Sequence, residues 1–88
     1  MEVFVFSLSD CIHCKDLKTK LNNSKISFKD LDIDQHKSIW EEILKQTGDN
    51  VVPTVCLYDG NEKAHIFVPG KDFNNGDEVI EMIKKYTL

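Results

Sequence analysis

The chain has 88 residues and a mass of 10.1 kDa, a size that fits one small domain and excludes a multidomain enzyme. Hydrophobic residues make up 41% of the chain and charged residues 30%, a composition typical of a folded globular protein. The net charge of −4 has the wrong sign for binding through phosphate neutralisation, so we expect no nucleic-acid partner.

The first third of the chain predicts a strand, a helix and a second strand. Apart from Glu2, residues 1–6 form an apolar, β-branched and aromatic run, typical of a strand that is covered on both faces. Residues 7–10 turn the chain and supply Ser and Asp as helix caps. Leucines at helical spacing after Cys14 predict a helix over residues 11–23. A second strand over residues 27–32 completes a parallel β-α-β unit.

The rest of the chain predicts a helix, a β-hairpin and a last helix. Residues 36–47 carry apolar side chains on one face, and Gly48 stands where a helix C-cap belongs. Residues 51–58 and 64–68 predict two strands, separated by an Asp-Gly-Asn turn signal. Apolar residues within 79–83 define the last helix, so the predicted order is βαβαββα.

Cys11 and Cys14 form a C-x-x-C motif, which serves either redox chemistry or half of a zinc site. The motif falls at the start of the first predicted helix, just beyond the carboxyl end of the first strand. A helix N-terminus offers free N–H groups and partial positive charge, which favour a thiolate. Zinc needs about four ligands, and the sequence contains no second C-x-x-C. We therefore predict a redox pair without a metal, with Cys11 as the exposed thiol and Cys14 one turn deeper.

At this point the sequence resembles the glutaredoxins, a small branch of the thioredoxin superfamily. The resemblance spans nearly the whole chain and is carried by residues 5–14, 28–34, 51–53 and 69–72. It implies an α/β thioredoxin/glutaredoxin fold, with a four-stranded mixed sheet in the order 2-1-3-4 flanked by three helices. The first and third helices would cover one face of the sheet, and the second helix the other.

The resemblance also implies which residues bind a substrate. Val52 and Pro53 would be joined by a cis bond that faces the active thiols, and the Val52 backbone would pair with an incoming disulfide or with glutathione. The backbone N–H groups of Lys71 and Asp72, at a helix start, would receive the γ-glutamyl carboxylate of glutathione.

Several departures from the family pattern fall on glutathione contacts. Leu8 stands where a lysine is usual, and Asp49 or Asn50 stands where a basic residue is often found. The usual Cys-Pro-Tyr-Cys motif has become Cys-Ile-His-Cys, which puts His13 next to the second cysteine. A protonated His13 imidazole would stabilise the Cys11 thiolate, and hence the reduced pair, which makes the couple more oxidising.

The resemblance implies a thiol–disulfide oxidoreductase that reduces protein or glutathione mixed disulfides through Cys11 and Cys14. The cysteine thiols carry the electrons, so we expect no tightly bound cofactor. Glutathione, as co-substrate, or a flavoprotein disulfide reductase would supply electrons to a monomer that acts on a disulfide-bearing client protein. The alternative is a binding or carrier module that holds an iron–sulfur cluster between two copies, as some glutaredoxins do.

The expected cellular compartment depends on two sequence features, a membrane-spanning segment and a signal peptide. No apolar run approaches the roughly 18 residues needed to span a bilayer, so no membrane association is expected. Glu2 stands where a signal peptide would carry positive charge, and three cysteines, an odd number, do not suit a secreted disulfide framework. We therefore expect a cytoplasmic protein with a single domain over residues 1–88. The third cysteine, Cys56, is predicted to be a small buried hydrophobe in mid-strand.

Overall fold

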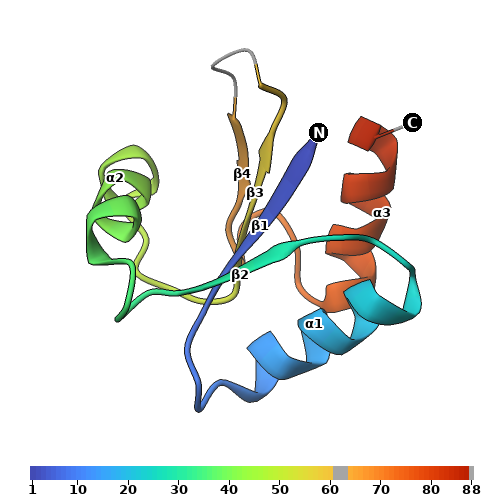
Figure 1. Cartoon of the computed structure of the whole chain (residues 1–88), viewed down its shortest axis with the longest axis horizontal. Helices are drawn as coiled ribbons and strands as arrows, with labels where there is room; N and C mark the ends of the chain where they lie inside the picture. Colours follow the sequence, from blue (N-terminus) through green and yellow to red (C-terminus); the bar gives the residue numbers. More distant parts are fainter. Residues whose placement is uncertain (61–63, 88) are drawn as a thin grey trace.

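The computed structural model describes residues 1–60 and 64–87 of the chain. The predicted order βαβαββα is confirmed. Asn61, the last residue of the predicted hairpin turn signal, lies outside the described residues. The elements are β1 (Glu2–Ser7), α1 (Ile12–Asn23), β2 (Lys29–Asp32), α2 (Lys37–Thr47), β3 (Thr54–Tyr58), β4 (Ala64–Phe67) and α3 (Gly76–Thr87) (Figure 1).

The four strands form one mixed sheet in the order β2-β1-β3-β4, as the resemblance implied. β1 is parallel to β2, with Phe6 beside Leu31, and antiparallel to β3, with Val5 beside Val55. β3 and β4 are antiparallel and place Val55 beside Phe67. β1 is thus an inner strand, which explains why its central residues, Val3 to Phe6, are all apolar.

The helices cover the two faces of the sheet in the predicted way (Figure 1). Consecutive strand residues point to opposite faces, so the neighbours Val5 and Phe6 belong to different parts of the core. Val5 packs in a cluster with buried side chains of α1 and α3, among them Leu17 and Ile83. Phe6 packs on the other face with Trp40 of α2. The carboxyl end of β1 leads into the loop that carries Cys11, the residue before α1.

Three predicted strand boundaries are wrong by a few residues. The third strand begins at Thr54 instead of residue 51, because Pro53 has no N–H to donate to a ladder and the first pair is Phe6 with Thr54. The fourth strand ends at Phe67, since the N–H of Val68 donates to a side chain instead of to a strand. The second strand begins at Lys29, after the turn that ends α1.

The ends of α2 show how local sequence sets a helix. Gly48 adopts a left-handed conformation with φ of 73° and donates its N–H to the Leu44 carbonyl, which confirms the predicted C-cap. Trp40 and Ile43 are buried, whereas Ile39, predicted on the same apolar face, is 47% exposed. Among the described residues, no helix combines the length and apolar character needed to cross a bilayer.

Candidate active site

Cys11 lies at the junction between the loop after β1 and the first turn of α1. Its backbone is extended, with φ of −93° and ψ of 110°, and it is the N-cap residue of the helix. Its Sγ atom accepts a hydrogen bond from the Cys14 N–H at 3.1 Å. The prediction that a Ser or Asp of residues 7–10 caps this helix is therefore wrong, because the cysteine sulfur itself takes the capping position.

Cys11 and Cys14 form a disulfide, so the structure represents the oxidised state of the pair. Their Cα atoms are 5.2 Å apart, within the ordinary range for a disulfide. Cys14 is fully buried and Cys11 is half-buried, which agrees with the predicted difference in depth. Ile12 and His13, the residues between them, are both exposed, and Ile12 retains 79% of its accessible surface.

A small polar network anchors α1 to the sheet near the cysteines. Ser7, the last residue of β1, donates its hydroxyl to the Asp30 carboxylate at 2.5 Å. Lys18 of α1 donates to the other oxygen of Asp30 at 2.8 Å. Burial alone would raise the pKa of Asp30, but the hydrogen bonds from Lys18 and Ser7 and the charge of Lys18 together hold it below its ordinary value. The network therefore favours an ionised Asp30 that bridges β1, β2 and α1.

A groove of about 280 Å³ is lined by His13, the residue between Ile12 and Cys14 in the motif. One wall comes from α1 through His13, Asp16 and Leu17, and the other from Val52–Pro53, Pro69 and residues 73–76. The structure thus brings the predicted site residues His13, Val52 and Pro53 together. Sequence reasoning missed the rest of the lining, although Asp16 lies three residues after His13 on the same helix face, a spacing that could have revealed it.

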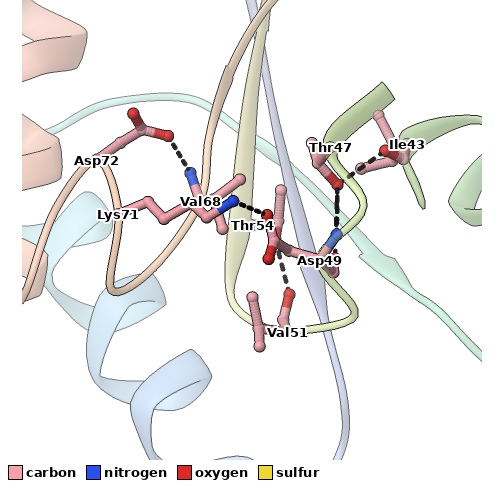
Figure 2. Close-up of polar contacts among 8 residues, drawn as sticks. All are labelled: Ile43, Thr47, Asp49, Val51, Thr54, Val68, Lys71 and Asp72. Atoms are coloured by element: carbon pink, nitrogen blue, oxygen red, sulfur yellow. Dashed lines mark hydrogen bonds and ion pairs between the residues drawn. The ribbon is translucent and has the colours of Figure 1, made fainter. Parts of the chain in front are cut away.

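The loop before β3 presents Val52 and Pro53 to the groove. The peptide bond between these residues is cis, and Pro53 is buried while Val51 is 40% exposed. Thr54, itself 1% exposed, donates its hydroxyl to the Val51 carbonyl at 2.7 Å, as Figure 2 shows. This hydrogen bond closes the loop around Val52 and so sets the shape of that wall of the groove.

Lys71 and Asp72 do not lie at a helix start, which corrects the expectation drawn from the resemblance. They follow Gly70 in a tight turn, and α3 begins only at Gly76. Their backbone N–H groups both donate to the Val68 carbonyl, at 3.2 Å for Lys71 and 2.9 Å for Asp72. The Asp72 carboxylate accepts the Val68 N–H at 2.7 Å (Figure 2). The turn thus uses internally the donors that were expected to receive a carboxylate.

The N-terminus of α3 is closed by its own side chains. Asn75 accepts the Glu78 N–H at 3.0 Å, and Glu78 accepts the Asn74 N–H at 2.7 Å. The arrangement is similar to a capping box, except that Glu78 accepts the N–H of Asn74, the residue before the N-cap Asn75. Asp77 and Glu78 also place two carboxylates in the first turn. Because these groups compensate the helix dipole, the α3 N-terminus has little attraction left for an anion.

The Lys71 side chain forms an ion pair with Asp49 at 2.6 Å. Figure 2 shows Lys71 and Asp49 beside the segment that contains Val51 and Thr54. The Asp49 N–H donates to the Thr47 hydroxyl at 3.2 Å, so it too is occupied within the chain. The sequence marked Asp49 as a departure from a basic family position but carried no signal for its partner, which lies 22 residues away.

Cys56 plays no part in this site. It is 7% exposed in the cluster on the α2 face of the sheet, so the prediction of a buried hydrophobe is confirmed. Burial raises the pKa of the Cys56 thiol, which keeps it neutral and unreactive. Within residues 1–60 and 64–87, His, Cys, Asp and Glu side chains form no group of three or more that could hold a metal ion.

A half-buried cysteine at the N-cap of α1, joined to a buried one, on a β2-β1-β3-β4 sheet with three helices, defines a thioredoxin-fold protein with a dithiol site. The glutaredoxin family model matches residues 3–61, and the chain therefore belongs to the glutaredoxin family. No curated protein sequence matches the chain significantly.

Solved structures with the same fold come from both branches of the superfamily. The glutaredoxin-like protein NrdH-redoxin from Escherichia coli is 19% identical with a TM-score of 0.67, and the alignment covers 97% of this chain and 93% of that one. Thioredoxin 1 from the thermophilic eubacterium Thermosipho africanus TCF52B is 25% identical, with a TM-score of 0.68 and coverage of 99% and 94%. A buckwheat glutaredoxin in complex with glutathione is 25% identical, with a TM-score of 0.59 and coverage of 98% and 71%.

Proposed function

We propose that this protein is a thiol–disulfide oxidoreductase that reduces disulfides of proteins, or their mixed disulfides with glutathione, through Cys11 and Cys14. The observation that carries the proposal is the position of Cys11. Its Sγ atom caps α1 and accepts the Cys14 N–H, while Cys14 is buried behind it. A helix N-terminus stabilises a thiolate, and an accessible thiolate is the species that attacks a disulfide.

The reaction consists of two exchanges. The Cys11 thiolate attacks one sulfur of the substrate disulfide, so that a mixed disulfide forms and the other sulfur leaves as a thiolate that takes up a proton. The Cys14 thiol then loses its proton and attacks Cys11 Sγ, which expels the second substrate thiolate. The substrate gains two electrons and two protons, and the protein is left with the Cys11–Cys14 disulfide that the structure contains.

The groove is the proposed binding site for the chain that carries the substrate disulfide. Val52 and Pro53 form one wall beside the cysteines, and an extended segment that pairs with the Val52 backbone would bring its disulfide to Cys11. His13, exposed within the disulfide loop and on the groove wall, is proposed to stabilise the Cys11 thiolate. No tightly bound cofactor is needed, since the cysteines carry both electrons.

The oxidised pair must be reset by a donor of two electrons, either glutathione or a flavoprotein disulfide reductase. The similarity to a buckwheat glutaredoxin that binds glutathione supports the first donor in general terms. A cytoplasmic monomer is the matching biological setting, because a reductase needs a reducing compartment to be recycled.

A coupled assay with a common NADPH readout tests the proposal. Wild-type protein should reduce a protein disulfide such as that of insulin, in the presence of either glutathione with its reductase or thioredoxin reductase. Cys11→Ser should be inactive in both arms. Absence of turnover in both arms, together with visible absorbance of the freshly purified protein, would favour the iron–sulfur carrier instead, because a dithiol protein is colourless.

A further inference from the structure

In the turn from Gly70 to Asp72, which adjoins the groove at Pro69 and Phe73, the groups that could bind an anion are already occupied within the chain. The N–H groups of Lys71 and Asp72 both donate to the Val68 carbonyl. The Lys71 ammonium, which belongs to the same turn, forms an ion pair with Asp49 at 2.6 Å. Asp49 is the more buried partner, with 27% of its side chain exposed against 63% for Lys71.

We propose that Asp49 is a specificity-determining residue, an inference that rests on the proposed function. Asp49 disfavours the binding of glutathione, so that the dithiol reacts preferentially with disulfides within polypeptides. Asp49 neutralises Lys71 and places a carboxylate at the start of the loop that runs from α2 to Val52. Glutathione carries two carboxylates and one ammonium group at neutral pH, so a ligand of this class needs cationic or N–H partners. Asp49 removes the cationic partner that the loop from Gly70 to Asp72 would otherwise offer.

The charges on the opposite side of the groove act in the same direction. Asp16 lines the groove from α1, and its carboxylate lies 3.3 Å from the Lys20 ammonium. Lys20 also pairs with Asp77 at 3.5 Å, so this lysine too is shared between carboxylates. Asp77 and Glu78 also lie in the first turn of α3. A second carboxylate of glutathione would therefore meet more carboxylates than ammonium groups on this side of the groove.

The apolar surface around the cysteines suits a polypeptide. Ile12 is 79% exposed between the two cysteines, and Val51 is 40% exposed at the loop before β3. Pro53 and Phe73 add apolar lining to the groove. A peptide segment gains from burying this surface and from backbone pairing, and neither contact requires an anionic group. The same surface offers little to a tripeptide whose recognition depends on its two carboxylates.

Variants of Asp49 test the inference without disturbing the catalytic cysteines. Asp49→Asn removes the charge at nearly constant size, and Asp49→Lys restores a basic residue at this place. Because exposed ion pairs contribute little to stability, both variants should fold, which circular dichroism checks. Glu42→Gln is the matched control, since it breaks the ion pair with Lys45 on the outer side of α2.

The first readout is binding of S-methylglutathione, which cannot react with the cysteines, followed by NMR. Wild type and Glu42→Gln should show no saturable shifts up to ~10 mM, which corresponds to less than about 3 kcal/mol of binding. Asp49→Lys should bind at least about tenfold more tightly than wild type, with shifts at the Lys71 and Asp72 amides and weakening at high salt. Asp49→Asn should fall between the two.

The second readout compares two mixed disulfides of one neutral peptide, the first with glutathione and the second with 2-mercaptoethanol. The measured quantity is kcat/KM for the glutathione disulfide divided by kcat/KM for the 2-mercaptoethanol disulfide. The ratio should be near one for wild type and rise about tenfold in Asp49→Lys. Saturable wild-type binding of S-methylglutathione below ~1 mM, or Asp49 variants that match Glu42→Gln in both readouts, would overturn the inference. If wild type reduced neither disulfide while the binding pattern held, the proposed function would fall and the role of Asp49 in excluding glutathione would stand.

Discussion

The backbone N–H of Cys14 lies 3.1 Å from the sulfur of Cys11, so the second cysteine of the motif helps to hold the first at the helix start. The two cysteines therefore have unequal environments, although they lie only three residues apart. Cys11 faces the solvent side of the first turn and receives the partial positive charge of α1, whereas Cys14 is fully buried.

Replacement of each cysteine should separate attack from resolution. Cys11→Ser should abolish all exchange, because the only accessible sulfur of the pair is gone. Cys14→Ser should still attack but should not release a protein substrate, so a mixed disulfide accumulates. Mass spectrometry after reaction with a disulfide-bearing protein measures the trapped species. A partner trapped on Cys14 in the Cys11→Ser protein would show that the roles are reversed.

His13 should tune the reduction potential of the pair. His13→Tyr removes a side chain that becomes cationic on protonation, so the reduced form loses stabilisation of its thiolate and the couple becomes more reducing. The expected shift is about 30 mV, equal to about 1.4 kcal/mol for two electrons. Equilibration with glutathione redox buffers measures it.

Two controls distinguish charge from other effects at this position. His13→Gln removes the charge without adding an aromatic ring and should shift the potential in the same direction. His36→Gln changes a histidine at the N-cap of α2, on the other face of the sheet, and should leave the potential unchanged. Equal potentials for all four proteins would leave His13 without an electrostatic role.

The Thr54 hydroxyl should contribute to substrate capture through the loop that it closes. Thr54→Val removes the hydrogen bond to the Val51 carbonyl at similar side-chain volume and should lower stability by about 1 kcal/mol. Because Val52 follows Val51, the groove wall loosens, and kcat/KM for a protein disulfide should fall several-fold. Thr54→Ser keeps the hydroxyl and should retain most of the turnover. Denaturant titration and insulin reduction provide the two measurements, and equal turnover of both variants would rule out this role.

Asp30 should make the fold sensitive to acid. Its folded-state pKa is lowered, so ionised Asp30 stabilises the fold above the carboxyl's unfolded pKa. This contribution is lost as the pH falls through the folded-state pKa, in the acid range below about pH 4. Asp30→Asn should therefore be less stable than wild type at pH 7, with a smaller difference at pH 3.

Denaturant midpoints at the two pH values measure the Asp30 contribution. Since 42% of its side chain is exposed, solvent screening should keep the effect modest. Glu41→Gln, at an exposed position on α2, is the control and should not change the pH dependence. A constant difference between wild type and Asp30→Asn from pH 7 to pH 3 would contradict the assignment.

The sequence by itself determined the order of the elements and the place of the dithiol. Hydrophobic periodicity and capping residues are local signals, because they depend only on the backbone conformation of neighbouring residues. Gly48 ends α2 in a left-handed conformation, and Cys11 is the N-cap of α1. The burial of Cys14 and Cys56 followed from the same patterns, because each occupies the inward side of its helix or strand.

Only the tertiary structure decided which groups around the dithiol remain available to a ligand. The Val68 carbonyl takes both N–H groups of the Lys71–Asp72 turn, and Asp49 pairs with Lys71 across 22 residues of sequence. Such pairings depend on how a turn closes and on how two loops come together at one end of the sheet. No periodicity encodes them, because hydrogen-bond partners distant in sequence are set by the packing of the whole chain.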